Sequence, residues 1–532
     1  MKKYSTSSIV RLGGLIGIIL MLVEEPIIAQ TVTHLPPLQS MPAQRAAKYE
    51  AQRVSHFEPL TAAQSSPENI PVPFPAVVQP PTADTDDGQA IDLATALRLA
   101  DRVNPDIGIS RQAILEALAR LKGARVLLLP SLTGGGNYHD HNGNLQRARG
   151  AILNLPAEQL FYFGGGARTV GAETVAFPAI RIFSHLGDAY FEPLAARQQT
   201  VVRQFDASAT FNSVLLNVST GYIDLMAAEA RLEVLRRSYC DASEAARLTA
   251  NFARVGQGRQ ADANRMRTEA ALIDSSIQRA QEQTAVAAAE LARLLNLDPS
   301  VRLRTVGGPI PILDLVDSKC RLDELLEVAL QRRPELAART AQVAEAETRF
   351  RQERTRALLP TVAIGFSAGD FGGGSNLVDP TFGKFAGRTD FDALAYWTMQ
   401  NFGVGNVALW RQRRAQEGQA LAARSRTVNL VRREVAEALA LVTAGRREVD
   451  VSEQRLIEAE AGLREELLRI EAGQGLPIEL LDNLTRAVEA RQAIIAAIAG
   501  YDRAEFRLFV ALGQPPTNAM PKADALNARA EE

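Results

Sequence analysis

Residues 428–470 read VNLVRREVAEALALVTAGRREVDVSEQRLIEAEAGLREELLRI. An aliphatic residue fills every seventh position of this stretch: Val428, Val435, Val442, Val449, Leu456, Leu463 and Ile470. Mostly small residues stand three places after the first five of these: Val431, Ala438, Gly445, Ser452 and Ala459. A sustained seven-residue period imposes a left-handed supercoil, and small side chains let neighbouring helices approach closely. The stretch predicts a helix from about 405 to 470, roughly 100 Å long at ~1.5 Å per residue.

The same register occurs a second time, 217 residues earlier (428 − 211 = 217). Its seven positions are Phe211, Val218, Leu225, Leu232, Tyr239, Ala246 and Ala253. Both stretches end at a glycine pair, Gly256-Gln-Gly258 and Gly473-Gln-Gly475, and these pairs are again 217 residues apart. An amphipathic segment follows each pair. The sequence therefore predicts two copies of one long helical hairpin.

Two shorter helical segments with proline breaks precede each expected hairpin. In the first copy the breaks fall at Pro105 and Pro130, and in the second at Pro334 and Pro360. The offsets between the copies are 334 − 105 = 229 and 360 − 130 = 230. Proline cannot continue a helix. Each copy is thus expected to contain a short helix, a break, a second helix and a stop.

Strand patterns follow each proline stop. Apolar and polar residues alternate over 362–368 and 391–399, and more faintly over 132–138 and 180–186. This period of two predicts in each copy a hairpin of two strands near ten residues, the length of a membrane β-strand. The offset falls from 230 to 217 in this region. We therefore expect the first copy to have a loop about a dozen residues longer, and exposed.

Three glycine runs, at 134–136, 164–166 and 372–374, lack the Lys-Ser/Thr ending of a phosphate loop, so we interpret them as hairpin-loop segments. His139 and His141 are the only metal-like pair of residues. They lack a third spaced ligand, and we expect them in an exposed loop. No nucleophile–base spacing is recognisable. The sequence predicts no enzyme, no metal site and no cofactor.

The composition limits the class of protein. Basic and acidic residues nearly cancel, 59 against 61, which gives no basic face for nucleic acid. Cys240 and Cys320 are too few for a disulfide framework, and we interpret them as two thiols or, in an exported chain, as one bridge. Beyond the N-terminal region, no apolar run has the ~20 residues that a membrane helix needs, which argues against an inner-membrane transporter.

The N-terminal region resembles an export signal. Basic residues precede a short apolar run at 15–23, which suits a signal-peptide core. We expect a signal peptide over residues 1–29, without a lipid anchor, and a proline-rich linker over residues 30–90. The expected organisation continues with a first repeat at 91–300, a linker at 301–320, a second repeat at 321–515 and a C-terminal tail at 516–532.

Two β-hairpins provide only four membrane strands, and four strands cannot close a barrel. Open strand edges in lipid would leave backbone groups unsatisfied, at several kcal/mol each. Other copies of the chain must therefore complete the sheet. Three copies would supply twelve strands (3 × 4), an even number that suits a membrane barrel. The same symmetry would close twelve long helices into a tube.

The duplicated motifs resemble the TolC family of outer-membrane efflux proteins. The resemblance rests on the Leu-Leu-Pro stops at 130 and 360 and on the turn motifs at 255–262 and 472–482, and it covers roughly residues 91–515. It implies a mixed, mainly α fold, in which a homotrimer forms a coiled-coil α-barrel in the periplasm and a twelve-stranded β-barrel in outer-membrane lipid. The implied function is a passive exit duct for a tripartite efflux or type I secretion system. An inner-membrane pump and a periplasmic adaptor protein would be its partners.

The resemblance also assigns roles to the two turns. The turns form the periplasmic tip that docks the adaptor, so the expected docking residues are Val255, Gly256, Gly258, Arg259, Gly473, Gly475 and Leu476. Alternatively, the glycines only terminate helices. Asp262, Glu479 and Asp482 are the expected periplasmic gate, where rings of carboxylates would favour cations. The alternative is that these acids stabilise helix N-termini.

This sequence departs from the better-known members at the gate. Ile470 and Gly475 stand where a tyrosine and an arginine can tether the closed state, so we expect a looser or different gate, with Arg259 as a possible substitute. Tyr396 and Trp397 suit an aromatic girdle of a membrane barrel, or else an ordinary buried strand. The main alternative function is a soluble periplasmic coiled-coil scaffold or adaptor, which would need no duplicated strand pairs.

Overall fold

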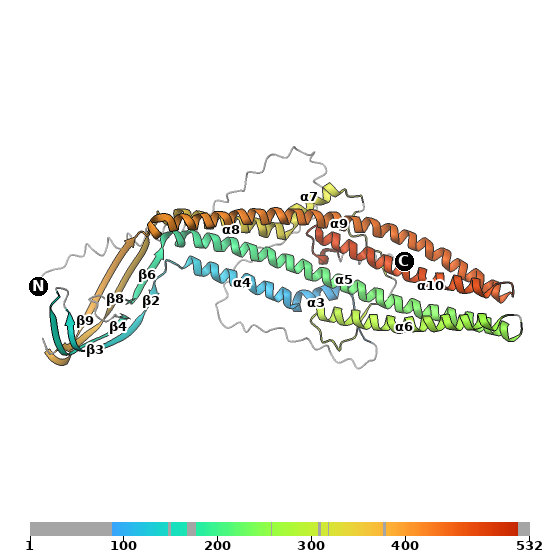
Figure 1. The fold of residues 1–532 in the computed structure, drawn as a ribbon, viewed down its shortest axis with the longest axis horizontal. Helices are drawn as coiled ribbons and strands as arrows, with labels where there is room; N and C mark the ends of the chain where they lie inside the picture. The colour runs from blue at the N-terminus through green and yellow to red at the C-terminus, as the bar shows by residue number, and fades with distance from the viewer. Residues whose placement is uncertain are drawn as a thin grey trace. The chain divides into compact units, whose positions relative to one another are not determined.

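The computed structural model describes residues 88–146, 150–167, 177–256, 258–306, 310–317, 319–375 and 379–519. These residues form long helices that carry strands at one end and two helix turns at the other (Figure 1). The expected signal peptide and nearly all of the proline-rich linker lie outside the described residues. Among the described residues, no helix combines the length and hydropathy that a membrane crossing requires.

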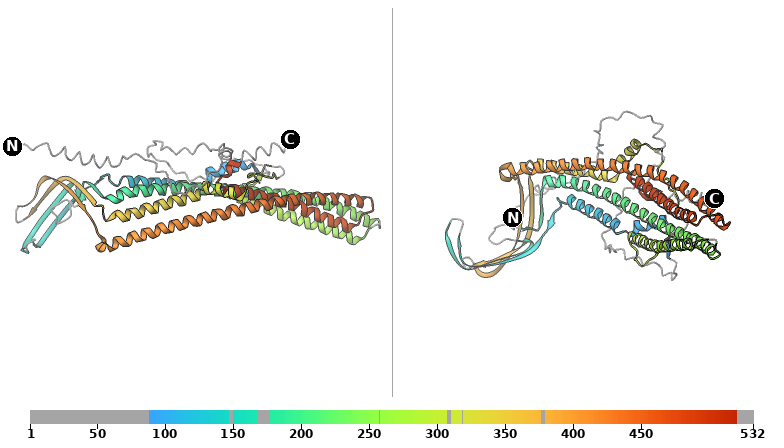
Figure 2. Two further views of the ribbon diagram at one scale, coloured as in Figure 1. Left: turned by 90° about the horizontal axis from the view of Figure 1, so that it is seen from above. Right: turned by 45° about the vertical axis from the view of Figure 1, so that its right-hand side comes forward.

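Two long helical hairpins dominate the fold, as predicted. The first consists of α5 (Leu186–Arg254) and α6 (Gln260–Leu294), and the second of α9 (Val404–Glu471) and α10 (Pro477–Ala511). Helices α5 and α9 contain 69 and 68 residues, and each is therefore about 100 Å long. Figure 2 shows the two hairpins side by side in two further views.

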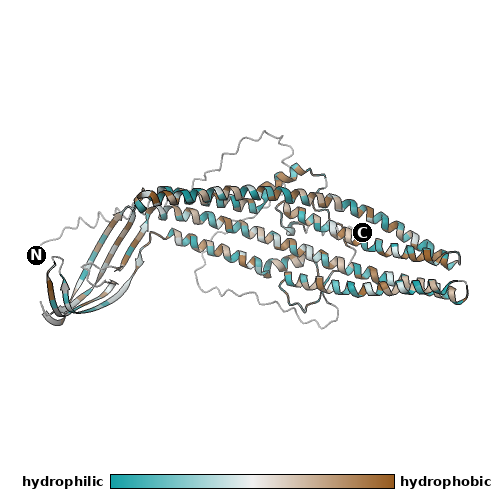
Figure 3. Cartoon of the chain, in the orientation of Figure 1, coloured by the Kyte–Doolittle hydropathy of each residue, from teal (hydrophilic) through white to brown (hydrophobic). Residues whose placement is uncertain are grey.

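The heptad positions form the packed side of these helices. On α9, eight residues of the pattern are buried: Val431, Val435, Ala438, Val442, Val449, Ser452, Leu463 and Ile470. The small positions allow close approach, because a Cβ on Gly221 would lie 3.0 Å from Leu294 Cδ1 and one on Gly445 would lie 3.3 Å from Tyr501 Cα. The opposite sides are polar, and hydrophobic and hydrophilic residues alternate along both hairpins (Figure 3).

Two shorter helices precede each hairpin, and the second of each pair begins at a proline, as expected. They are α3 (Leu93–Val103), α4 (Pro105–Arg125), α7 (Leu322–Arg332) and α8 (Pro334–Arg356). Pro105 and Pro334 occupy the first turn of α4 and α8, where a missing N–H costs nothing. Helix α4 packs on α5, and α8 packs between α5 and α9.

The strands form one antiparallel sheet that joins the two copies. They are β2 (Ser131–Leu132), β3 (Gly134–Gln146), β4 (Ile152–Ala167), β5 (Phe177–Pro178), β6 (Ile180–His185), β8 (Thr361–Ser375) and β9 (Asp379–Tyr396). Strand β8 pairs along one edge with β9, and along the other with β6 near the helices and β4 farther away. Strands β2 and β3 pair outside β6 and β4, respectively. The sheet is thus effectively four strands wide.

The two faces of this sheet differ in polarity. Ile180, Phe366 and Phe391 lie directly opposite one another on three neighbouring strands, and directly opposite residues share a face. Each of the three is more than 40% exposed. The adjacent row contains Arg181 and Asp392 on either side of Gly365, and it points to the other face. One face therefore carries an exposed apolar row and the other carries charge.

The glycine runs lie within strands, so their prediction as hairpin loops is wrong. They belong to β3, β4 and β8. The reason is close approach: a Cβ on Gly369 would lie 2.8 Å from the Tyr162 hydroxyl, and one on Gly373 would lie 2.1 Å from the Gln159 carbonyl oxygen. Tyr162 is 1% exposed and donates a hydrogen bond to the Gly165 carbonyl at 2.7 Å. Gly369 therefore makes room for an aromatic ring that lies across the sheet, and Gly373 makes room for the backbone of the neighbouring strand.

The histidine pair also lies in a strand rather than in the expected loop. His139 and His141 pair across β3 and β4 with Leu160 and Glu158. Their rings stack with centroids 6.3 Å apart. Side chains two residues apart on a strand share a face, which explains the stacking. Among the described residues, no group of three or more His, Cys, Asp or Glu side chains is placed to hold a metal ion.

Three further elements had no sequence signal. A short parallel pair joins β1 (Gln89–Ile91) to β7 (Leu303–Thr305), and both strands overlap the expected linkers. The turn η1 (Gln400–Gly403) leads into α9. The turn η2 (Pro516–Ala519) begins the expected tail and has both end residues buried.

The extra length of the first copy falls between β4 and β6, where the second copy has the unbroken strand β9. Most of this segment, residues 168–176, lies outside the described residues, so its exposure stays a prediction.

Candidate docking tips and gate

The first turn joins α5 to α6. Helix α5 ends at Arg254, and the Val255 N–H still donates to the Asn251 carbonyl at 3.1 Å. Gly256 follows with a φ of +79°, in the left-handed region that favours glycine. Val255 is 65% exposed. The glycine does terminate the helix, and the same turn presents an apolar side chain to solvent.

The second turn joins α9 to α10 with tighter packing. Gly473 has a φ of +74°, and the Gly475 N–H donates to the Arg469 carbonyl at 3.0 Å. A Cβ on Gly475 would lie 2.8 Å from Glu466 Oε1 and 2.9 Å from the Ile470 nitrogen. No larger residue fits there without a shift of the helix end. The next residue, Leu476, is 55% exposed.

Further exposed apolar residues surround the second turn. Leu468 on α9 is 66% exposed and Ile478 on α10 is 52% exposed. More than half of each side chain is thus left accessible to solvent at this end of the hairpin. Exposed apolar residues gathered at one place typically mark an interaction site.

Each of the three expected gate acids pairs with an arginine of the same chain. Asp262 lies 3.4 Å from Arg265, and Asp482 lies 2.8 Å from Arg486. Glu479 lies 3.7 Å from Arg469 across the turn. Asp262 and Glu479 also occupy the first turns of α6 and α10, where acids stabilise a helix N-terminus. Asp262 and Glu479 are therefore placed to stabilise their helix N-termini. In any pore, the paired arginines would offset part of the negative charge of all three acids.

Ile470, which stands at one of the two expected tether positions, packs as an apolar residue. Ile470 is 3% exposed and packs in one apolar cluster with Met266, Leu480 and Leu484 from both hairpins. Arg259 is the N-cap residue of α6, is exposed, and makes no side-chain cap hydrogen bond. Its role as a substitute tether remains a prediction.

A buried arginine that the sequence analysis missed joins the two hairpins. Arg491 on α10 lies 2.6 Å from Asp241 on α5 and 2.6 Å from Glu460 on α9. It also donates to Ser238 Oγ at 3.0 Å. Its side chain is only 6% exposed. The hydrogen bond from Arg491 lowers the pKa of the Glu460 carboxyl. These ion pairs lie along the helices, away from the two turns, so the turn motifs in the sequence do not indicate them.

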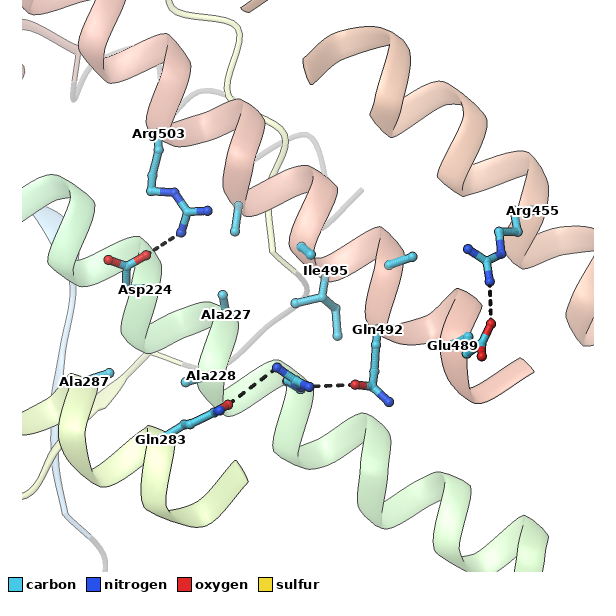
Figure 4. A pocket seen from close by; sticks show the side chains of 14 residues that line it. Asp224, Ala227, Ala228, Gln283, Ala287, Arg455, Glu489, Gln492, Ile495 and Arg503 are labelled. Atoms are coloured by element: carbon cyan, nitrogen blue, oxygen red, sulfur yellow. Dashed lines mark hydrogen bonds and ion pairs between the residues drawn. The ribbon is translucent and has the colours of Figure 1, made fainter. Parts of the chain in front are cut away.

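An open groove borders the same seam between α5 and α10 (Figure 4). Arg231 donates to Gln492 Oε1 at 3.1 Å, and Arg503 pairs with Asp224. Six alanines line the groove between these polar groups: Ala227, Ala228, Ala287, Ala493, Ala496 and Ala499. The seam thus combines small apolar residues with ionic links between the hairpins.

Comparison with known families gives a match to the outer membrane efflux protein family over residues 325–514. A comparison with curated proteins gives no match. No disulfide joins Cys240 to Cys320.

Solved structures share the fold over most of the chain. The outer-membrane channel OprN superposes with a TM-score of 0.64 at 16% identity, covering 82% of this chain and 99% of its own. The CmeC outer membrane channel of Campylobacter jejuni gives 0.66 at 15% identity, with coverage of 82% and 89%. The open state of the MtrE outer membrane channel of Neisseria gonorrhoeae gives 0.61 at 19% identity, with coverage of 80% and 89%.

At these identities the structures establish the fold. The family match covers the second repeat, and the internal duplication extends the same architecture to the first. Over residues 325–514 the chain is thus similar to the outer membrane efflux protein family, and over about four fifths of its length it shares the fold of outer-membrane channels.

Proposed function

We propose that this protein is the outer-membrane exit duct of a tripartite efflux or type I secretion system, and that it acts as a homotrimer. The sheet carries the proposal. It has an exposed apolar row on one face, charged residues on the other, and edges at β9 and at β2–β3 that have no further strand partner among the described residues. Lipid tolerates such a sheet only when its edges are paired.

Three copies solve the edge problem. The β9 edge of one protomer would pair with the β2–β3 edge of the next, which gives twelve strands (3 × 4) and a closed barrel. The row that contains Phe366 would then face lipid, and Arg181 and Asp392 would face the aqueous interior. A soluble scaffold or adaptor, the alternative function, would not expose that apolar row to water.

The helical part would lie in the periplasm and end at the tips. Val255 and Leu476 are the exposed apolar residues of the two turns, and we infer that they contact a periplasmic adaptor protein. The adaptor would couple the duct to an inner-membrane pump that supplies the energy. The duct itself would transport passively, without catalysis.

The gate would consist of Asp262, Glu479 and Asp482 around the narrow end of the tube. Because each acid pairs with an arginine, we expect only a moderate preference for cations. The Arg491 tie would hold the second hairpin against the first in the closed state.

Fractionation of the full chain and planar-bilayer recording test the proposal together. We expect the protein in the outer membrane, as a trimer that becomes a monomer on gels after heating, and as a conducting channel in the bilayer. A soluble monomer that does not conduct would refute the duct and favour the scaffold.

A further inference from the structure

Two acidic side chains are buried in the C-terminal third of α10, apart from the tips and the Arg491 tie. Asp502 is 0% exposed and Glu505 is 1% exposed. Burying an ionised carboxylate is far more costly than burying a neutral carboxyl group, unless partners compensate its charge. The hydrogen bonds of these two groups therefore indicate which form the fold accommodates.

Only one oxygen of each carboxyl group has a partner. Asp502 Oδ1 accepts a hydrogen bond from the Leu313 N–H at 2.9 Å. Glu505 Oε2 accepts from the N–H groups of Leu315 and Val316 at 2.9 and 3.0 Å. Asp502 Oδ2 and Glu505 Oε1 are buried without any hydrogen-bond partner. Neither bare oxygen has a donor that would stabilise a full negative charge, so burial makes the neutral, protonated form less costly than the ionised form.

All three donors belong to residues 310–317, here named the strap, which links the two repeats. Leu313 and Leu315 are buried, and they pack in one apolar cluster with Ile223 and Phe506. The strap forms no helix or strand. Asp502 and Glu505 thus accept the hydrogen bonds from the strap backbone to α10, and a side-chain hydrogen bond between Tyr501 and Asp314 adds to this attachment.

The charged groups around the strap do not compensate both acids. Arg503 pairs with Asp224 on α5. Arg446 on α9 lies 3.6 Å from Asp314 of the strap, and its guanidinium lies over the Tyr501 ring.

The Tyr501 hydroxyl donates to Asp314 Oδ1 at 2.5 Å. Burial raises the pKa of Asp502 to about 8, and burial likewise raises the pKa of Glu505. Asp314 also lies close enough to raise the pKa of both Asp502 and Glu505, and the two nearby arginines, Arg446 and Arg503, pair with Asp314 and Asp224.

We propose that the strap is a proton-dependent clasp between the two repeats. It stays docked on α10 while Asp502 and Glu505 carry protons, and it detaches when these groups release their protons to water. Ionisation would place two negative charges beside Asp314 in an apolar site. Detachment of the strap lets water reach the two carboxylates and removes the contact between the strap and α10. This inference does not depend on the transport function.

The sign of the pH dependence follows from the raised pKa. Between the ordinary Asp pKa of about 4 and the native value of about 8, the docked form holds a proton that the detached form has lost. The clasp is therefore tightest below that window, and it loosens as the pH rises through it. One such group changes the opening equilibrium by up to about tenfold per pH unit.

Hydrogen exchange of the full-length protein tests the clasp. The strap amides of Leu313, Leu315 and Val316 are followed from pH 6 to 9, with rates corrected for intrinsic exchange. We expect wild-type protection to fall as the pH rises. Asp502→Asn keeps the acceptor oxygen and removes the ionisation, so it should flatten this loss, and Asp502→Asn with Glu505→Gln should flatten it further.

An exposed acid provides the matched control. Glu453 lies exposed on α9, so Glu453→Gln should keep the wild-type pH profile, and melting at pH 6 verifies that every variant folds. Equal profiles for the wild type and the double variant would overturn the proposal. So would stabilisation of the wild type by Ca²⁺ or Mg²⁺ that Asp502→Asn abolishes, because the bare oxygens would then hold a cation rather than protons.

Discussion

Arg491 and Asp241 lie 2.6 Å apart across the seam between the two hairpins, although 250 residues separate them in the chain. The same guanidinium reaches Glu460 on α9. One buried cation thus holds three long helices in register. Because α5 belongs to the first hairpin and α9 and α10 to the second, this contact fixes one hairpin against the other.

Replacing Arg491 with Met should loosen the second hairpin. The change keeps most of the apolar stem but leaves Asp241 and Glu460 without their cation. Their side chains are 28% and 23% exposed, so we expect a loss of about 2 kcal/mol, below the cost for a fully buried pair. Thermal melting measures this loss, and planar-bilayer recording should show more frequent or larger openings.

Arg455 offers a control for the Arg491 experiment. It pairs with Glu489 at 2.9 Å, but both side chains are at least half exposed and both belong to the second hairpin. Arg455→Gln should change stability by less than about 1 kcal/mol and leave conductance unchanged. Equal effects of the two substitutions would show that the Arg491 tie has no special role.

Charge changes at the gate should alter ion selectivity in both directions. Neutralising Glu479 and Asp482 together, as Glu479→Gln and Asp482→Asn, should reduce the preference for cations in a planar bilayer. Arg486→Gln frees Asp482 from its 2.8 Å partner and should increase that preference. Reversal potentials in a salt gradient measure both effects. If neither changes the reversal potential, these acids only stabilise their helices.

Charged substitutions at the tips should weaken adaptor binding without unfolding the protein. Val255 and Leu476 are more than half exposed, so Val255→Glu with Leu476→Glu should change stability by within about 0.5 kcal/mol. We expect the affinity for a periplasmic adaptor protein to fall at least tenfold in a binding assay. Val451, which is 68% exposed on the shaft of α9, gives the control Val451→Glu. Unchanged binding of the tip variant would place docking elsewhere.

Substitution by arginine at two neighbouring residues of β9 should have different effects on assembly in the outer membrane. Phe391 belongs to the apolar row, whereas Asp392 points to the charged face. Arginine facing the middle of a bilayer costs about 2–4 kcal/mol in a membrane barrel, so Phe391→Arg should reduce the yield of heat-sensitive trimer in the outer membrane. Asp392→Arg should assemble normally. Equal yields would contradict the assignment of the lipid face.

The long helices could be predicted because their signal is local and repeated. The heptad positions of α9 follow one another every seven residues, and the seven positions identify the buried side before any partner is known. The same holds for the first-turn prolines at 105 and 334. The two tips could be found because a glycine pair ends each long pattern.

Other features depend on residues far apart in sequence. Gly369 suits a strand only because Tyr162 lies across it, and a glycine run alone resembles a loop. Strand β1 is three residues long, and its partner β7 lies more than 200 residues away. Arg491 and Asp502 each have partners about 190 to 250 residues distant. No spacing along the chain indicates such pairs, so the seam and the strap emerged only from the structure.

The duplication has a consequence for how partners bind. In a trimer, the tips at Gly256 and Gly473 would alternate around the rim, so one encoded substitution alters three docking positions and leaves three intact. Binding through several linked contacts gains strength by avidity, which falls steeply only when too few contacts remain. A partner assembly of matching valence could therefore tolerate loss of either kind of tip but not of both. Selection can then change one tip while the other preserves assembly.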